Sequence, residues 1–178
     1  MSLEIATLGP ADRPDVVAFF AALPMGEHVF FKENIADGRV VRDWLDETRG
    51  GWLVARLGPG GPVVGVAAVV PGFGWSAHVG ELRMIVDPAH RSQGIGAVLA
   101  RRALQAAVEL GLAKLTVETL AEQQGVIDLF RGLGFVPEAL LADQVVDAGG
   151  GVHDLIVLAN PVQQAWAQPA ALGAADLP

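Results

Sequence analysis

One stretch, residues 78–119, constrains the fold of this chain more than any other. It holds a strand-like segment at His78–Val86, a turn with glycines, a long helix-like segment, and a second strand-like segment at Lys114–Thr119. The helix-like segment repeats apolar residues at helical spacing and ends at Gly111. When a strand, a helix and a strand join one sheet, the strands are parallel and the crossover is right-handed. We therefore expect one parallel β-α-β unit at the centre of the fold.

The residues before this unit predict further strands and two helices. Alternating or continuous apolar runs bounded by Gly and Pro indicate strands, and with His78–Val86 the second and third of these strands form an antiparallel meander. Asp12 and Asp37 are the expected N-caps of the helices, and Pro14 suits a first helical turn. The expected elements are strands at 3–8, 50–57 and 62–70 and helices at 12–23 and 38–48.

The residues after the unit predict a helix and a hairpin. Val126, Leu129, Phe130 and Leu133 have helical spacing, and Gly134 follows them. The expected strands are a short one at 135–136 and a hairpin of 139–146 and 152–158. Residues 1–160 then form a single α/β (α+β) domain, in which a mixed, mostly antiparallel sheet carries helices on both faces. Residues 161–178, rich in Ala, Gln and Pro, are expected to be a loose tail.

The glycine turn before the long helix suits an anion. A helix N-terminus exposes unpaired N–H groups with partial positive charge, and Arg91 adds a full charge there, so pyrophosphate is a natural ligand. The alternative is that the glycines serve turn geometry only. A Walker A loop is excluded because Ala97 and Val98 follow Gly96, and the dinucleotide fingerprint is excluded because Leu99 stands where a small residue is needed.

Composition excludes several other functions. The chain has no cysteine, which rules out disulfides, thiolate catalysis and cysteine metal sites, and its four histidines lack metal-ligand spacing, so no metal is expected. A net charge of −8 argues against nucleic-acid binding and suits either a cationic partner or simple solubility. The apolar runs are too short to span a bilayer and no signal sequence begins the chain, so a cytoplasmic location without membrane insertion is expected.

The glycine turn also resembles a known family motif. Residues 91–96, Arg-Ser-Gln-Gly-Ile-Gly, fit the Q/R-x-x-G-x-G/A loop of the GNAT superfamily of acetyl-CoA-dependent N-acetyltransferases. The preceding "ELRMIVDP" is similar to the family's central strand, and "VIDLFRGLGF" resembles its later helix. The resemblance spans about residues 3–158, with its sharp motifs in 79–136.

The resemblance implies where acetyl-CoA binds. The amides of 93–97 would hold the pyrophosphate, with help from Arg91. The central strand and the next strand would separate after Val86 and near Thr119, and the pantetheine arm would pair with residues 84–86. An N–H of Ile85 or Val86 would polarise the thioester carbonyl. The implied cofactor residues are Met84, Ile85, Val86, Arg91, Ser92, Gln93, Gly94, Ile95, Gly96, Ala97, Gln123 and Phe130.

Two glutamates are candidates for the base that takes a proton from the attacking amine. Glu118 has the spacing to Phe130 at which some protein-acetylating members carry their base, and Glu81 lies on the central strand, where many members have an acid. The alternative for each is an exposed strand carboxylate without a role. The chain departs from the family at Phe130, where many members have a tyrosine acid, and at Gln123, where they have asparagine.

The acceptor is expected to contact the parts least like the family, which are residues 25–35, residues 71–78 and the last hairpin. Phe30, Phe31 and Trp75 could line an apolar side of the site and Glu27 or Glu33 could meet a cation; the alternative is that these aromatics fill core and loop contacts.

The acceptor class and the activity itself stay open at this stage. Protein amino groups, free amino acids, polyamines and amino-bearing drugs remain candidate acceptors. The competing hypotheses are a coenzyme A-binding module without turnover and nucleotide binding at the same loop. Homodimers are common on such folds, but no sequence feature shows an interface.

Overall fold

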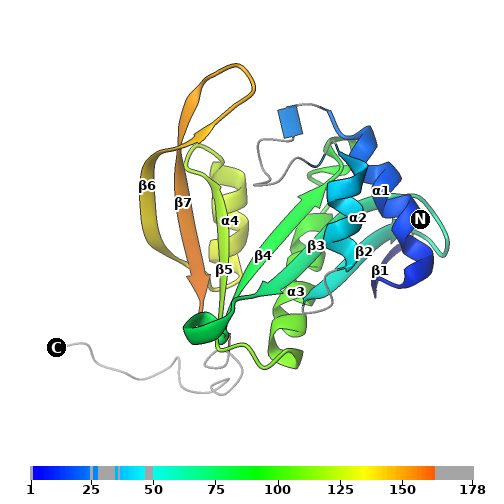
Figure 1. Ribbon diagram of the computed structural model, residues 1–178, viewed down its shortest axis with the longest axis horizontal. Helices are drawn as coiled ribbons and strands as arrows, with labels where there is room; N and C mark the ends of the chain where they lie inside the picture. The colour runs from blue at the N-terminus through cyan, green and yellow to red at the C-terminus, as the bar shows by residue number, and fades with distance from the viewer. Residues whose placement is uncertain (1, 25, 28–34, 36, 47–49, 163–178) are drawn as a thin grey trace.

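Seven strands form one mixed sheet in the order β1-β2-β3-β4-β5-β7-β6, as Figure 1 shows. The computed structural model describes all residues except 1, 25, 28–34, 36, 47–49 and 163–178. The strands are β1 (Leu3–Thr7), β2 (Gly51–Leu57), β3 (Val63–Pro71), β4 (Val79–Val86), β5 (Lys114–Leu120), β6 (Val136–Val146) and β7 (Val152–Asn160). The helices are α1 (Arg13–Ala22), α2 (Gly38–Asp46), α3 (Ile95–Glu109) and α4 (Gln124–Gly132), with short 3-10 turns η1 (Pro10–Asp12), η3 (Gly74–Ser76) and η4 (Pro88–His90).

The pairing of the strands confirms the predicted fold class. β4 and β5 are parallel and joined through α3, whereas all other neighbours are antiparallel. The prediction of a short strand followed by a separate hairpin strand was wrong in one respect. Residues 136–146 form one strand, because irregularities between Pro137 and Ala139 and between Leu141 and Val145 absorb the breaks in its pattern.

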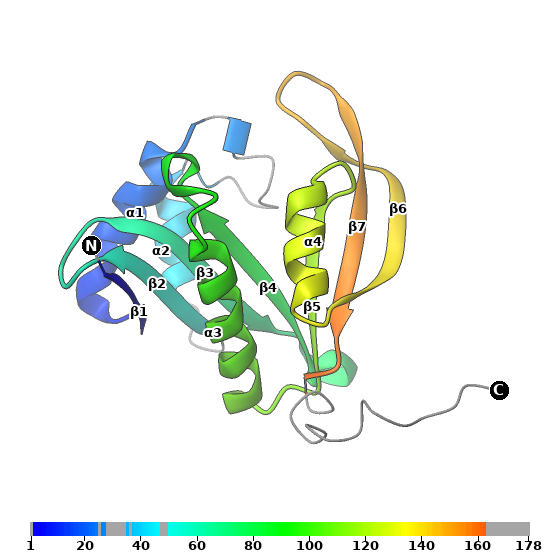
Figure 2. The same ribbon diagram turned by 180° about the vertical axis from the view of Figure 1, so that it is seen from behind.

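The helices cover the two halves of the sheet differently. Side chains of α1 and α2 pack on one face of β2, β3 and β4, and α3 packs on the opposite face of the same strands. The helix α4 lies on the α3 side of β5 and β7 (Figure 2). We call β1–β4 the closed half. We call β5, β7 and β6 the open half, because none of the described helices covers its face opposite α4 (Figure 1).

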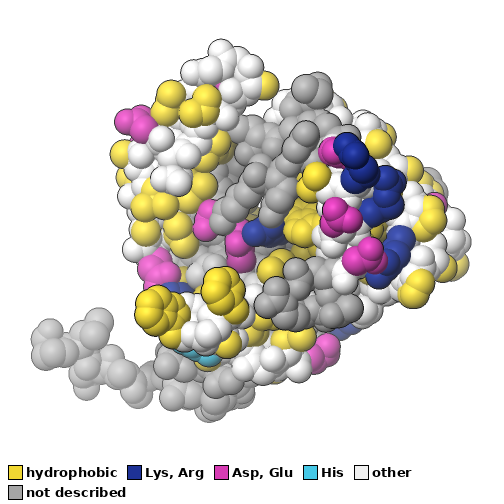
Figure 3. Space-filling view, in the orientation of Figure 1, with side chains coloured by type: hydrophobic (Ala, Val, Ile, Leu, Met, Phe, Trp, Pro, Cys, Tyr) yellow, Lys and Arg dark blue, Asp and Glu magenta, His cyan; other side chains and the backbone are white. Residues whose placement is uncertain are grey.

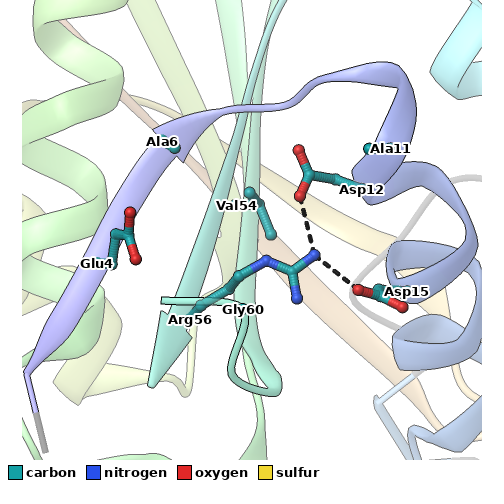
Figure 4. Close-up of a pocket in the computed structure, with 8 residues that line it drawn as sticks. All are labelled: Glu4, Ala6, Ala11, Asp12, Asp15, Val54, Arg56 and Gly60. Atoms are coloured by element: carbon teal, nitrogen blue, oxygen red, sulfur yellow. Dashed lines mark hydrogen bonds and ion pairs between the residues drawn. The ribbon is translucent and has the colours of Figure 1, made fainter. Parts of the chain in front are cut away.

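A partly buried arginine links α1 to the closed half. The Arg56 guanidinium, on β2, donates to Asp12 at 2.9 Å and to Asp15 at 2.8 Å (Figure 4), and also to the Gly61 carbonyl at 2.8 Å. Asp12 stands at the predicted N-cap position of α1, but its side chain does not cap that helix. Its carboxylate accepts the Gly9 N–H instead, and this bond, together with Arg56, lowers its pKa.

The start of α2 agrees with the sequence prediction, whereas the start of the predicted tail does not. Asp37 does bond to its helix, since its carboxylate accepts the Arg39 N–H at 2.8 Å. Val162, placed by the sequence in a loose tail, is fully buried in the core, because its side chain completes the apolar layer under α3 and α4. The rest of that predicted tail, 163–178, lies outside the described residues. None of the described helices is long and apolar enough to cross a membrane.

Candidate active site

The parallel pair β4–β5 is hydrogen-bonded over only part of its length. Val79–Leu82 pair with Lys114–Val117, and no pair follows. The strands therefore separate after Leu82 and Val117, earlier than the predicted separation after Val86 and near Thr119. The cause is β7, since β5 stays paired with β7 up to Leu120 and follows it away from β4.

The separation leaves the outer half of β4 with one edge unpaired toward β5. The Asp87 N–H donates to the Val64 carbonyl of β3 at 2.9 Å, and backbone groups alternate sides along a strand. The groups of Ile85 therefore point to β3, and those of Met84 and Val86 point to the gap. The Val86 carbonyl, which accepts a bond from Arg91 Nε at 3.2 Å, agrees with this assignment. Of the two predicted oxyanion donors, the geometry favours Val86.

A cleft of about 1620 Å³ runs through this gap from one face of the sheet to the other. On the α3–α4 face, its lining comes from the start of α3 and from α4. On the opposite face, it is lined by strand residues, including both candidate glutamates. All twelve predicted cofactor residues except Gln93 line this cleft: Met84, Ile85, Val86, Arg91, Ser92, Gly94, Ile95, Gly96, Ala97, Gln123 and Phe130.

The glycine turn forms an open cradle at the start of α3. Gly94 is the N-cap residue with φ +80°, and no side chain caps the helix there. A Cβ on Gly94 would meet nothing within 4 Å, and Gly94, Ile95, Gly96 and Ala97 all line the cleft, so the start of the helix opens onto it. At Gly96, a Cβ would lie 3.6 Å from Leu129, which places this glycine against α4. Uncapped helical N–H groups facing an open space suit an anionic ligand.

Arg91 contacts protein groups on both sides of the cleft end. Its Nε donates to the Val86 carbonyl, and its Nη2 forms an ion pair with the Glu27 carboxylate. The sequence predicted that Glu27 meets a cation of the acceptor, but in the structure the cation that it meets is Arg91. The pair was missed because the two residues are 64 positions apart. The predicted contact of Arg91 with pyrophosphate stays a prediction.

The two candidate bases lie on the face opposite the glycine turn. Glu81 shares its side of β4 with Arg83 and Ile85, whereas Leu82 and Met84 pack into the cluster under α3 and α4. Glu81 belongs to the paired part of the strands and accepts a bond from Arg83 at 3.2 Å. Glu118 is the first residue of β5 beyond the last β4 pair. Its position at the opening makes Glu118 the better placed of the two.

Phe130 and Gln123 border the gap from α4 and from the residue before it. Phe130 is 1% exposed and packs against Phe135 with ring centroids 5.1 Å apart, so it supplies an apolar wall and no hydroxyl. The Gln123 side-chain oxygen accepts a bond from the Thr119 hydroxyl. The sequence interpretation missed Thr119 as a cleft residue. The signal was a polar residue on the inward side of β5, in line with Leu115 and Val117.

The segments predicted to contact the acceptor differ in whether they line the cleft. None of residues 71–78, all of them described, lines the cleft. Trp75 is 96% exposed on η3, at the end of β4 away from the gap, so it neither lines the cleft nor fills the core, the two roles that the sequence left open. Phe30, Phe31 and Glu33 lie outside the described residues. The last hairpin does line the cleft, as predicted, through residues of β6, β7 and the turn between them.

A histidine that contacts two carboxylates lies near the tip of that hairpin. His153 contacts Asp147 through Nε2 at 3.0 Å and Glu122, before α4, through Nδ1. The bond to Asp147, with that to Glu122, raises the pKa of His153. The bond from His153 and the Gly151 and Gly149 amides lower the pKa of Asp147. Among the described residues, no group of three or more His, Asp or Glu side chains is arranged to hold a metal ion.

Comparison with known proteins identifies the class to which this fold and cleft belong. The fold matches an acetyltransferase, YncA from Salmonella typhimurium, solved with its cofactor acetyl-CoA, with a TM-score of 0.77 and 20% identity over 98% of this chain and 100% of that one. It also matches ribosomal-protein-alanine N-acetyltransferase from Brucella melitensis, with a TM-score of 0.75 and 24% identity over 89% of this chain and 99% of that one. The chain shares the fold of these two solved structures.

The sequence comparison makes the assignment specific. Residues 19–135 match the Acetyltransferase (GNAT) family. N-acetyltransferase 8F1 of Rattus norvegicus is 30% identical over 125 residues, which cover 67% of this chain and 54% of that protein. The chain thus spans about half the length of the curated relatives it matches. The chain belongs to the acetyltransferase (GNAT) family, as its glycine turn indicated.

Proposed function

We propose that this protein transfers the acetyl group of acetyl-CoA to a primary amine. One observation carries the proposal: the cleft passes through the sheet and joins the open N-terminus of α3 on one face to Glu81 and Glu118 on the other. A donor held at α3 and an amine held near the glutamates can meet only at the gap between β4 and β5. Membership of the GNAT family supports the same chemistry.

The residues at the α3 end fit acetyl-CoA. The amides of 93–97 bind the pyrophosphate, because the uncapped helix start offers N–H groups and partial positive charge. The unpaired edge of β4 at Met84 and Val86 receives the pantetheine amides as a strand would. The Val86 N–H faces the gap and donates to the thioester carbonyl, whose negative charge grows as the amine attacks.

Glu118 acts as the base. The amine nitrogen bonds to the acetyl carbon, its proton passes to the Glu118 carboxylate directly or through a water, and the carbon–sulfur bond breaks to release the coenzyme A thiolate. No enzyme nucleophile takes part, which agrees with the absence of cysteine. Phe130 has no proton to give, so the thiolate takes its proton from solvent.

Thiol release from acetyl-CoA with a panel of amines tests the proposal. We expect turnover with at least one amine, and a fall in kcat of about 10²- to 10⁴-fold in Glu118→Gln. Glu81→Gln is the matched control on the neighbouring strand and should lose much less. Both variants should bind acetyl-CoA as the wild type does, because neither residue contacts the glycine turn. A larger loss in Glu81→Gln would transfer the role to Glu81.

The second candidate is a coenzyme A-binding module without turnover. The observation that favours it is Phe130, which stands where many family members have a tyrosine. Tight acetyl-CoA binding with no thiol release for any amine would support the binding module and contradict acetyl transfer.

Homodimer formation and the cytoplasmic location both stay predictions.

A further inference from the structure

A row of three leucines crosses the open half on the same face as Glu118. Leu120 of β5 pairs with Leu155 of β7, and Leu155 pairs with Leu141 of β6. Side chains of directly opposed residues lie about 4.5–5.5 Å apart, so the three form a continuous apolar surface. All three line the cleft. We call them the leucine row.

The leucine row borders the cleft and is buried at its Leu120 end and partly exposed at Leu155 and Leu141. Leu120 is 8% exposed, Leu155 is half-buried and Leu141 is 39% exposed. None of the described helices covers this face of the open half, and Figure 3 shows hydrophobic side chains over β6 and β7 beside acidic side chains in the central hollow. Apolar surface that faces a ligand cleft gains its hydrophobic stabilisation when an apolar ligand group covers it.

The charges near the leucine row do not favour an acceptor with several cations. Asp147 and Glu122 hold His153, and Glu81 bonds to Arg83. A second ammonium group on the acceptor would therefore compete with cations of the protein itself for these carboxylates. Glu118, two residues before Leu120 on the same face, is the carboxylate next to the leucine row along β5.

We infer that the acceptor is a primary amine attached to a hydrocarbon group that lies on the leucine row, with its nitrogen beside Glu118. This inference rests on the proposed acetyl transfer. Two residues along a strand span about 7 Å, so a hydrocarbon of roughly four to six carbons reaches from Glu118 onto the row. The chemistry fits both a small alkyl- or aralkylamine and the N-terminus of a peptide with an apolar first residue.

A homologous series of acceptors tests this inference. We expect kcat/KM to rise about threefold per methylene from propylamine to hexylamine, because each added group leaves water for the leucine row. Diaminopentane and 5-aminopentanol, which match the length but end in a polar group, should be poorer than hexylamine by at least about tenfold. Peptides beginning with Leu and with Ser form a second arm, which distinguishes a peptide source from a small molecule.

Two adjacent leucines on opposite faces of β6 provide matched variants. Leu141 lies two strands from β5, about 10 Å across the sheet, so only a longer chain reaches it from Glu118. Leu141→Ser should therefore raise KM for decylamine about five- to tenfold and leave acetyl-CoA affinity unchanged. Leu140→Ser, 61% exposed and facing the α4 side, should leave both unchanged. If polar and apolar acceptors turn over equally in both arms, or if the two variants behave alike, the inference is overturned while acetyl transfer stands. Absence of thiol release for every amine would instead overturn the proposed function on which it rests.

Discussion

The closed and open halves of the sheet are built from similar strands but have different surroundings. In the closed half, β2 and β3 are buried on both faces between α1 and α2 on one side and α3 on the other. In the open half, the strand face opposite α4 borders the cleft and carries Glu118 and the leucine row. Burial that stabilises the fold is concentrated in the first region, and the reactive chemistry is exposed in the second.

The polar contacts that anchor the two halves respond to pH in opposite directions. Arg56 in the closed half carries a permanent charge, and its carboxylate partner Asp12 has a lowered pKa, so stability from Asp12 is present above its unfolded pKa and is lost as the pH falls. His153 in the open half has a raised pKa, so its contribution is full below the unfolded value and is lost as the pH rises through the folded value. The two anchors thus weaken at opposite ends of the pH scale.

The largest effect on stability should come from the closed half. Phe20→Ala removes a ring that is 1% exposed between α1 and α2, so we expect the free energy of unfolding to fall by about 3–5 kcal/mol. Phe73→Ala makes the same change at a position that is 80% exposed and should cost less than about 0.5 kcal/mol. Urea denaturation of both variants measures the difference. Equal losses would show that burial is not concentrated as the structure indicates.

A smaller effect is expected from the anchor of the closed half. Arg56→Met keeps much of the side-chain packing but removes the bonds to Asp12, Asp15 and the Gly61 carbonyl. Because the carboxylates are partly exposed, we expect a loss of about 1–2 kcal/mol at pH 7 in urea denaturation. Arg39→Met, at an exposed ion pair with Asp37, is the control and should change stability little. A loss in Arg56→Met no greater than in this control would contradict an anchoring role.

The smallest effect should be the pH dependence of the open half. As the pH rises through the raised pKa of His153, the charge that holds Asp147 and Glu122 is lost. The Tm of the wild type should therefore fall relative to that of His153→Gln between pH 6 and pH 9, by a few degrees at most. Thermal unfolding at both ends of this window measures it. Parallel Tm curves for the two proteins would exclude a stabilising role for the contacts of His153 with Asp147 and Glu122.

The fold could be predicted from the sequence because its signals are local. Periodicity and glycine breaks placed the parallel β-α-β unit and the meander, and they located the glycine turn at the start of α3. The site could be predicted only in part. The point at which β4 and β5 separate depends on β7, the partner of Arg91 is Glu27 from a distant loop, and the leucine row exists only through the register of three strands.

The short pairing between β4 and β5 has a consequence for how the two halves hold together. The two halves are hydrogen-bonded to each other along Val79–Leu82 and Lys114–Val117. Among the described residues, no strand pairs with the outer part of β4 on that side. A ligand that bonds to this unpaired edge supplies hydrogen bonds that no neighbouring strand supplies there. By mass action, such a ligand at a hundred times its Kd adds about 2.7 kcal/mol to the stability of the folded state. Acetyl-CoA would then act as a removable strand of the sheet. The free energy of unfolding would rise with the fraction of the protein that has acetyl-CoA bound.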